Sequence, residues 1–175
     1  PDDLREKLAH TWRTGIKRGS HPGWDSLAPF YRPRKGELTV VTGIPGHGKS
    51  TFVNHLAVNL IAREQWKFGI YSAEMQPPER HMELFIQQAS GFPFHEGPTA
   101  RLSLPEVNSV LSTLQKNLQF IRLEDNPTID TLIDMALWMS KRPGGLDGLI
   151  IDPWNELDHS RPDWQSETEY ASISL

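Results

Sequence analysis

The chain has 175 residues, a formal net charge of −4 from 18 Lys+Arg and 22 Asp+Glu, and no cysteine. This length suits one domain, and a chain of this size buries roughly 70% of its unfolded surface, enough for a core without cross-links. The lack of cysteine excludes disulfides, iron–sulfur clusters, thiolate zinc sites and a cysteine nucleophile. No apolar run approaches the roughly 18 residues that cross a membrane, and the first residues lack the order of a signal peptide, so we expect a soluble, intracellular protein with no membrane partner.

Charge is unevenly distributed along the chain. Basic residues outnumber acidic ones over the first 50 residues, and acidic residues dominate the remainder. The net acidity argues against a protein that coats duplex DNA by bulk charge, because such binding needs a positive surface. Nucleic acid held by a few local loops is still compatible with this composition.

An amphipathic helix is predicted from residue 2 to about residue 17, because four apolar residues recur at every fourth position: Leu4, Leu8, Trp12 and Ile16. Its apolar stripe has to be buried against another surface. Glycine and proline at positions 19, 22 and 23 end the helix, and a loop rich in Gly, Pro and basic residues follows. We therefore divide the chain into a linker helix with a lead-in loop, residues 1–36, and a main domain, residues 37–175.

The main domain alternates between short β-branched runs and helical patterns. We predict strands at residues 38–41, 68–72, 118–123 and 149–152, and helices at residues 50–63, 77–90, 103–117 and 128–139. Capping boxes at residues 103–106 and 166–169 mark helix starts, and Trp66 and Trp138 are expected to face the core. Strands separated by helices require right-handed crossovers and a largely parallel sheet, so the predicted fold class is α/β.

The most specific motif follows the first predicted strand and opens the next helix. It satisfies the pattern G-x-x-x-x-G-K-[ST] with Gly43, Ile44, Pro45, Gly46, His47, Gly48, Lys49 and Ser50. Glycines let the backbone wrap closely, so that successive N–H groups and the positive helix end can hold phosphates. Lys49 is the charge expected at the β- and γ-phosphates, and the Ser50 hydroxyl is the expected Mg²⁺ ligand. Ile44, Pro45 and His47 occupy variable positions, and no catalytic role is expected for His47. The alternative is a glycine-rich turn with a surface lysine.

Two carboxylates at strand ends complete the predicted nucleotide site. Asp152 ends an apolar strand, an arrangement that holds Mg²⁺ through water opposite Ser50, although it could instead only cap the following turn. Many hydrolytic ATPases place a catalytic Glu directly after this Asp, but this sequence does not. Glu74 is the candidate to activate water, because it lies just beyond the second strand, on the carboxyl edge where parallel sheets bind ligands. An ordinary acidic residue at a helix start is the alternative, and Glu156 and Asp158 are weaker candidates as base or metal contact.

The combination of a P-loop, a Glu after the second strand and a Walker B strand without a following Glu resembles the RecA-like core of hexameric replicative DNA helicases. This is the DnaB and Twinkle group, which includes phage primase-helicases. Residues 23–27 and 34–39 are similar to that family's approach to the P-loop, and residues 71–75 to its second motif. Residues 151–159 and 167–170 resemble most closely the Twinkle-like enzymes of phages and plant organelles.

The resemblance implies a three-layer α/β core and a ring ATPase, hexameric in this family, that uses ATP and Mg²⁺ to translocate on single-stranded DNA and to separate duplex in replication, as part of a primase-helicase. By residue, the P-loop from Gly43 to Thr51 would bind nucleotide, Lys49 would contact phosphate, Asp152 would support the metal and Glu74 would activate water. The linker helix would dock on the adjacent subunit, with packing on its own domain as the alternative. The implied location is the cytoplasm of a bacterial or phage-infected cell, or an organelle for a plant-type relative.

The sequence also departs from the family pattern. In this family the central strand, the DNA-contacting loops and the arginine finger follow the Walker B segment, beyond Leu175. That later strand lies between the Walker A and Walker B strands, so without it we expect an apolar gap between the two halves of the site. We therefore expect this sequence to be part of a longer chain, to contact single-stranded DNA only through loops beyond Leu175, and to hydrolyse ATP weakly alone, since an arginine finger contributes about 10³ to 10⁵ in rate. A RecA-like recombinase or clock-type ATPase, and an ATP-dependent assembly or switch module, are the alternatives.

Overall fold

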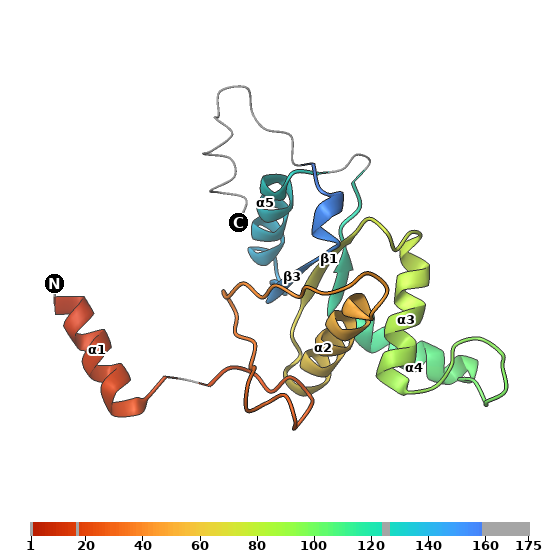
Figure 1. The fold of residues 1–175 in the computed structure, drawn as a ribbon, viewed down its shortest axis with the longest axis horizontal. Coiled ribbons are helices and arrows are strands. Elements are labelled where there is room, and N and C mark those ends of the chain that lie inside the picture. Colours follow the sequence, from red (N-terminus) through yellow and green to blue (C-terminus); the bar gives the residue numbers. More distant parts are fainter. Residues whose placement is uncertain (1, 17, 124–126, 159–175) are drawn as a thin grey trace.

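Three parallel strands form the centre of the domain (Figure 1). The computed structural model describes residues 2–16, 18–123 and 127–158. Strand β1 (Phe68–Ser72) lies in the middle, between β2 (Leu118–Phe120) and β3 (Gly148–Asp152). Both neighbours run parallel to β1, and the register pairs the last residue of β1, Ser72, with the last residue of β3, Asp152. The predicted α/β class and parallel sheet are confirmed, and the carboxyl ends of β1 and β3 lie side by side.

Four helices of the main domain are α2 (Lys49–Glu64), α3 (Pro78–Ser90), α4 (Leu104–Gln115) and α5 (Ile129–Ser140), and a 3-10 turn, η1 (Trp154–Glu156), follows β3. Their ends have local causes. Ser103 and Glu106 form the predicted capping box of α4, and the Thr128 hydroxyl accepts a hydrogen bond from the Thr131 N–H at the start of α5. Gly91, at a left-handed φ of 75°, ends α3. The second predicted capping box, residues 166–169, lies outside the described residues.

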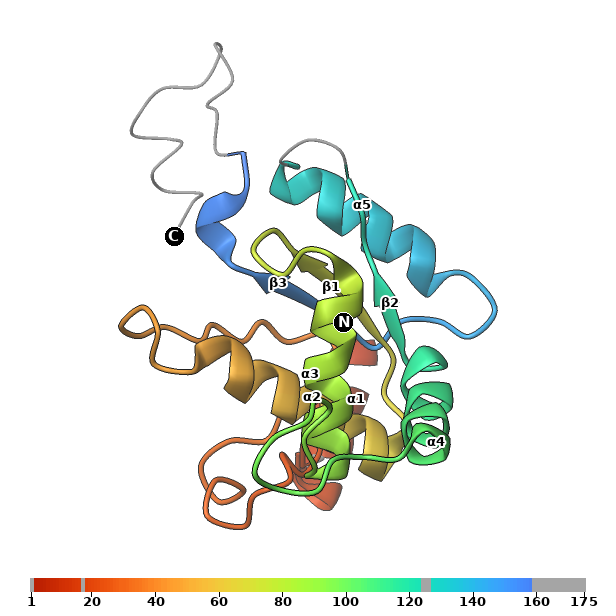
Figure 2. The ribbon, with the colours of Figure 1, turned by 90° about the vertical axis from the view of Figure 1, so that its right-hand side faces the viewer.

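Helices cover both faces of the sheet (Figure 2). One buried cluster packs α2, α3 and α4 against the strands and includes Leu60, Ile70 and Phe85. A second cluster packs α5 against the opposite face and includes Tyr71 and Leu132. Neighbouring β1 residues Ile70 and Tyr71 belong to different clusters because successive side chains of a strand point to opposite faces. The result is the three-layer core that the sequence predicts.

The strand predicted at residues 38–41 does not form. Its segment is irregular and its apolar side chains face solvent, with Leu38 90% and Val40 76% exposed. A β-branched run becomes a stable strand only when its backbone pairs with a neighbour. Within the described part of the chain, the sheet contains only β1, β2 and β3, and none of them pairs with this segment.

The linker helix α1 (Asp2–Thr14) forms but ends about three residues earlier than predicted, before Gly15 at a positive φ of 73°. It stands away from the sheet (Figure 1). Its apolar stripe is exposed, from 62% at Leu8 to 87% at Trp12. Packing of this helix on its own domain therefore does not occur among the described residues. None of the described helices is long and apolar enough to span a membrane.

Trp138 was also expected in the core, and that prediction is wrong. It is 56% exposed on α5, and the guanidinium of Arg142 lies 3.8 Å from its ring centroid. The other predicted core tryptophan, Trp66, is 5% exposed, which confirms that prediction. Trp138 is therefore an aromatic side chain on the outer surface of α5.

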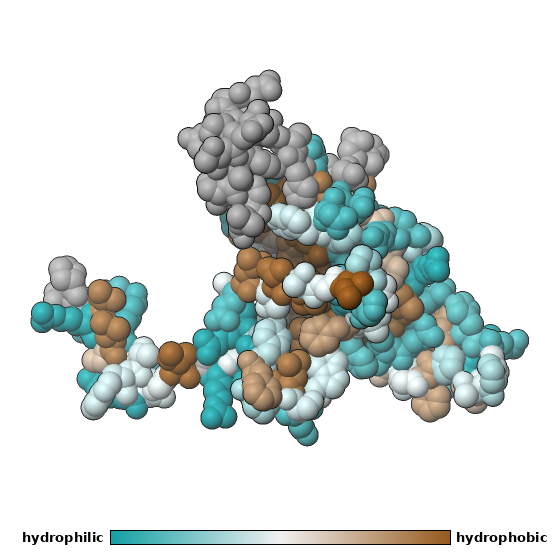
Figure 3. Space-filling model, viewed as in Figure 1, coloured by the Kyte–Doolittle hydropathy of each residue, from teal (hydrophilic) through white to brown (hydrophobic). Residues whose placement is uncertain are grey.

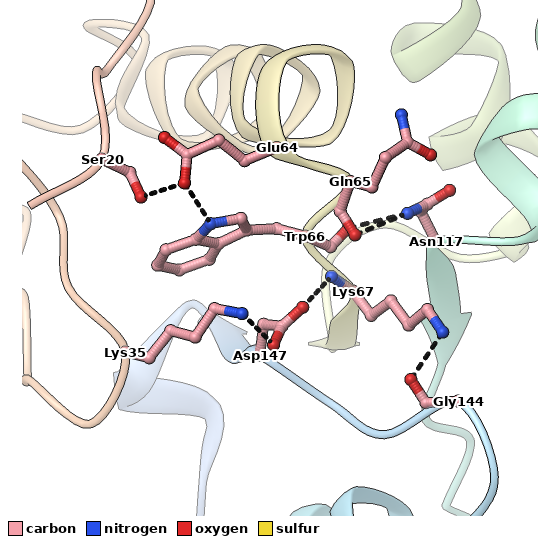
Figure 4. Close-up of polar contacts among 9 residues, drawn as sticks. All are labelled: Ser20, Lys35, Glu64, Gln65, Trp66, Lys67, Asn117, Gly144 and Asp147. Carbon is pink, nitrogen blue, oxygen red and sulfur yellow. Dashed lines mark hydrogen bonds and ion pairs between the residues drawn. The ribbon is translucent and has the colours of Figure 1, made fainter.

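Polar contacts tie the lead-in loop to the amino edge of the sheet (Figure 4). Asp147, just before β3, accepts a hydrogen bond from the Lys67 N–H at 2.9 Å and pairs with the Lys35 ammonium at 2.6 Å. Burial alone would raise the pKa of Asp147, but these contacts outweigh it and hold the pKa below its usual value. The bond from Ser20 lowers the pKa of Glu64, whose carboxylate also accepts from the Trp66 indole.

The lead-in loop also packs along the outer side of α2. The Trp24 ring stacks on Phe52 with centroids 5.3 Å apart, and the Asn59 amide donates to the Pro22 carbonyl at 3.0 Å. These contacts begin in the first turn of α2 and continue along the helix. The loop thus fastens the amino edge of the sheet and leaves the carboxyl edge, where β1 and β3 end, to carry the candidate site.

Candidate nucleotide-binding site

The P-loop forms an open backbone cradle at the start of α2. Gly46 and Gly48 have positive φ angles of 77° and 81°, which favour glycine, and Gly48 is the N-cap of the helix. A Cβ added at either glycine would meet nothing within 4 Å, so the space beside them is open. Because Gly48 provides no side-chain cap, the first N–H groups of α2 can bind an anion, favoured by the positive end of the helix dipole. The helix begins at Lys49, one residue before the predicted start.

The Lys49 side chain folds back over this loop. Its ammonium donates to the carbonyls of Gly43 at 3.0 Å and Ile44 at 3.1 Å. An ammonium has three donors, so it can exchange these carbonyls for phosphate oxygens without moving far. His47 Nδ1 lies 3.0 Å from the Pro45 carbonyl oxygen, a contact within the loop. Ser50 and Thr51 follow Lys49 in the first turn of α2.

Glu74 lies in the turn between β1 and α3, two residues beyond the end of the strand. Its side chain is exposed, and it makes no hydrogen bond or ion pair with any described residue. The turn itself is held by Ser72, whose hydroxyl accepts from the Met75 N–H at 3.2 Å and whose carbonyl accepts from the Gln76 amide at 3.0 Å. The Glu74 carboxylate is thus unpaired among the described residues and lies on a fixed turn, so it is available to reach a bound ligand.

Asp152 is half-buried at the carboxyl end of β3, directly beside Ser72 of β1. The sheet register therefore places Asp152 and the turn that carries Glu74 on the same edge. Glu156 lies in η1, where its charge adds to the effect of burial in raising the pKa of Tyr71. Asp158 donates its backbone N–H to the Pro127 carbonyl at 3.0 Å.

The two halves of the predicted site do not touch each other. Within residues 2–16, 18–123 and 127–158, neither Glu74 nor Asp152 hydrogen bonds or pairs with Lys49. Apolar surface lies at the centre of the molecule in this view (Figure 3). In the segment that leads into the P-loop, Leu38 is 90% and Ile44 68% exposed. Strand β3 is only half-buried along its whole length. The apolar gap expected between the two halves stays a prediction.

Two buried polar residues near the site were not singled out from the sequence. His81 of α3 is 0% exposed and Asn54 of α2 is 2% exposed, and His81 Nε2 lies 3.3 Å from the Asn54 side-chain oxygen. A sequence signal existed for Asn54, which is one helical turn after Ser50 and on the same helix face. His81 carries no such signal, because a histidine in an amphipathic helix gives no indication of its partner.

The residues present fit a Mg²⁺–nucleotide. Open glycine backbone, a helix N-terminus and Lys49 suit a polyphosphate, and the Ser50 hydroxyl and Asp152 carboxylate are oxygen ligands of the kind Mg²⁺ prefers. When bound, the metal would supply charge neutralisation between phosphate oxygens. The fold and the motif together define an α/β protein with a P-loop at the start of α2.

Comparison with known proteins identifies the family. Residues 32–175 match the DnaB-like helicase C terminal domain, and the chain belongs to this family. The Twinkle homolog protein, chloroplastic/mitochondrial, of Arabidopsis thaliana is 36% identical over 167 residues, which cover 92% of this chain and 23% of that protein. The probable plasmid replicative DNA helicase of Chlamydia psittaci is 26% identical over 142 residues, which cover 80% of this chain and 31% of that protein. The chain thus spans less than a third of the length of these relatives, and the recognised DnaB and Twinkle resemblance is confirmed.

Proposed function

We propose that this protein is the nucleotide-binding part of an ATP-dependent DNA helicase motor that acts in replication. The observation that carries the proposal is the P-loop at the start of α2, combined with Glu74 and Asp152 at the carboxyl ends of adjacent parallel strands. Family membership and the two helicase relatives support the same function. We also propose that the motor is part of a primase-helicase and that it translocates on single-stranded DNA.

Each residue has a distinct proposed role. The P-loop N–H groups and Lys49 would bind the β- and γ-phosphates, and Ser50 would provide the hydroxyl ligand for Mg²⁺. Asp152 would hold the metal through water. Glu74 would orient a water molecule and accept its proton during hydrolysis, which the unpaired state of its carboxylate among the described residues allows.

We further propose that ring assembly buries the exposed stripe of α1 on a second copy of the chain. The surface that we propose for this contact is a shallow, mainly apolar depression of about 210 Å³ between α5 and β3, lined by Ile133, Leu137 and Leu149 among others. Both surfaces belong to the same chain but are different patches, so their contact is heterologous and repeats around a ring when the rotation closes. A hexamer follows from the family resemblance.

Glu74→Gln tests the motor function. The variant keeps the shape of the side chain but cannot accept a proton, so we expect ATP binding to persist. The ATP turnover, which is expected to be weak in this chain alone, should fall further by a factor of about 10² to 10⁴, to below detection. Binding is measured with a fluorescent ATP analogue and turnover by phosphate release, with and without single-stranded DNA. If wild-type protein binds ATP but Glu74→Gln leaves turnover unchanged, the motor role of Glu74 is wrong.

An assembly or switch module, in which ATP only joins subunits, is the second candidate, and the exposed stripe of α1 favours it as much as it favours a motor. Such a module would lose little of its function in Glu74→Gln. The same experiment therefore separates the two, provided that assembly is measured alongside turnover. A RecA-like recombinase would share the P-loop but not the segment at residues 152–158, Asp-Pro-Trp-Asn-Glu-Leu-Asp.

A further inference from the structure

A buried histidine of α3 contacts both the P-loop helix, α2, and strand β2. His81, in the first turns of α3, has no exposed surface. Its ring stacks on Phe85 of the same helix, with centroids 4.9 Å apart, and lies 5.4 Å from the ring of Phe120 of β2. Two aromatic rings therefore fix the plane of the imidazole. A ring held in this way can set the position of whatever it hydrogen bonds.

His81 makes its hydrogen bond to the P-loop helix. Nε2 lies 3.3 Å from Asn54 Oδ1, and Asn54 is 2% exposed. An amide oxygen only accepts, so Nε2 carries the proton and donates. Nδ1 is buried without a partner among the described residues, which disfavours a charged ring, because a cation would bury a second N–H unpaired. Burial also lowers the pKa of His81.

The bonded face of α2 is the face that carries the predicted metal ligand. Asn54 follows Ser50 by four residues, and side chains four residues apart lie one above the other on a helix. On the other side, the charge of Asp152 acts on His81, opposing the effect of burial on its pKa. His81 thus contacts the face of the helix that carries one predicted metal ligand, Ser50.

From this arrangement we infer that His81 is a positioning residue of the nucleotide site. Its Nε2–H bond to Asn54 fixes the face of α2 that carries Ser50 relative to α3 and to Phe120 of β2. Resting on the proposed nucleotide site, this inference adds a role that neither the P-loop motif nor the strand-end carboxylates contain. It predicts that the bond controls how well Mg²⁺ joins the bound nucleotide.

Four variants separate positioning from packing. His81→Phe removes the donor but keeps an aromatic ring between Phe85 and Phe120, and Asn54→Leu removes the acceptor at similar volume. His81→Gln keeps an N–H donor near the position of Nε2. Ile86→Ala is the matched control, because it weakens the packing of the same buried cluster from the same helix, and Ile86 makes no hydrogen bond or ring contact with His81 or Asn54. Thermal unfolding of every variant reports packing independently of ligand.

The measured quantity is the Mg²⁺ concentration that gives half-maximal binding of a fluorescent ATP analogue. We expect this concentration to rise about tenfold in His81→Phe and in Asn54→Leu, as when groups that orient metal ligands are removed. The double variant should be no worse than either single variant, because both remove one bond. His81→Gln should stay close to wild type, and Ile86→Ala should lower the unfolding temperature without changing the Mg²⁺ requirement.

Several outcomes would overturn the inference: a wild-type Mg²⁺ requirement in His81→Phe or Asn54→Leu, effects that multiply in the double variant, or an equal rise in Ile86→Ala. If His81→Phe does not fold, Asn54→Leu and His81→Gln decide by the same criteria. A wild-type protein that binds no ATP at any Mg²⁺ concentration would refute the proposed nucleotide site itself. ATP binding in the wild type with no effect of these substitutions would refute only the role of His81.

Discussion

Trp12→Ala is the substitution that most clearly separates assembly from folding in this protein. The Trp12 side chain is 87% exposed on α1, in line with Leu8, which is 62% exposed. Truncating a side chain in solvent removes no packing, so the free energy of unfolding should change by no more than about 0.5 kcal/mol. Any larger effect must come from a surface that covers the ring in the assembled protein.

The cost in the assembly can be worked out from that exposure. A tryptophan buries about 150 to 250 Å² when fully covered, and most of that area is still available here. Tryptophans at the centre of an interface commonly contribute about 2 kcal/mol or more to binding. A loss of this size raises the dissociation constant of the subunit contact about thirtyfold.

Sedimentation velocity over a range of protein concentrations, with Mg²⁺ and a slowly hydrolysed ATP analogue, measures this change. His10→Ala is the matched control, because His10 is exposed on the same helix but lies outside the apolar stripe. We expect Trp12→Ala to shift assembly to higher concentration and His10→Ala to leave it unchanged. Identical assembly of Trp12→Ala and wild type would refute the role of the stripe.

Two further substitutions test how the lead-in loop is fastened to the core. Asp147→Asn weakens the contacts with Lys35 and Lys67, and we expect urea unfolding at neutral pH to show a loss of about 1 to 3 kcal/mol. The folded-state pKa of Asp147 is lowered, so its contribution is complete above the unfolded pKa of about 3.9 and is lost as pH falls through the lower folded value. The difference between variant and wild type should therefore narrow below about pH 4, and a constant difference would contradict this sign. Gly19→Ala places a Cβ against the carbonyl oxygens of Arg32 and Pro33, so it should lower the unfolding temperature. Gly97→Ala is the control, because a Cβ at Gly97 meets nothing within 4 Å, and it should leave the unfolding temperature unchanged. Equal effects of the two substitutions would argue against the close approach at Gly19.

Much of the fold could be predicted from the sequence because most of its signals are local. The capping box at Ser103, the glycine that ends α3 and the apolar run of β3 each act within a few residues. The P-loop could be recognised for the same reason, since its glycines, Lys49 and Ser50 are consecutive. The positions of Glu74 and Asp152 followed from the rule that parallel strands end at one edge of a sheet.

The errors arose where a segment depends on a partner distant in the sequence. Residues 38–41 have a strand composition, but composition does not supply the neighbouring strand whose hydrogen bonds would stabilise it. Trp138 is apolar, yet it lies on the outer surface of α5 beside Arg142. His81 was missed because its significance comes from its hydrogen bond to Asn54, which is 27 residues earlier in the sequence, on α2. Roles of the site residues in ATP chemistry stay predictions.

Isothermal titration of ATP with Mg²⁺ into the wild type and into Lys49→Ala bears on all of these proposals at once. The wild type should bind one ATP per chain in a Mg²⁺-dependent manner. Lys49→Ala should retain its fold, because the Lys49 ammonium contacts only carbonyls of its own exposed loop among the described residues, and should lose most of its affinity. Absence of ATP binding by the wild type, or equal binding by Lys49→Ala, would contradict the assignment of a P-loop helicase motor.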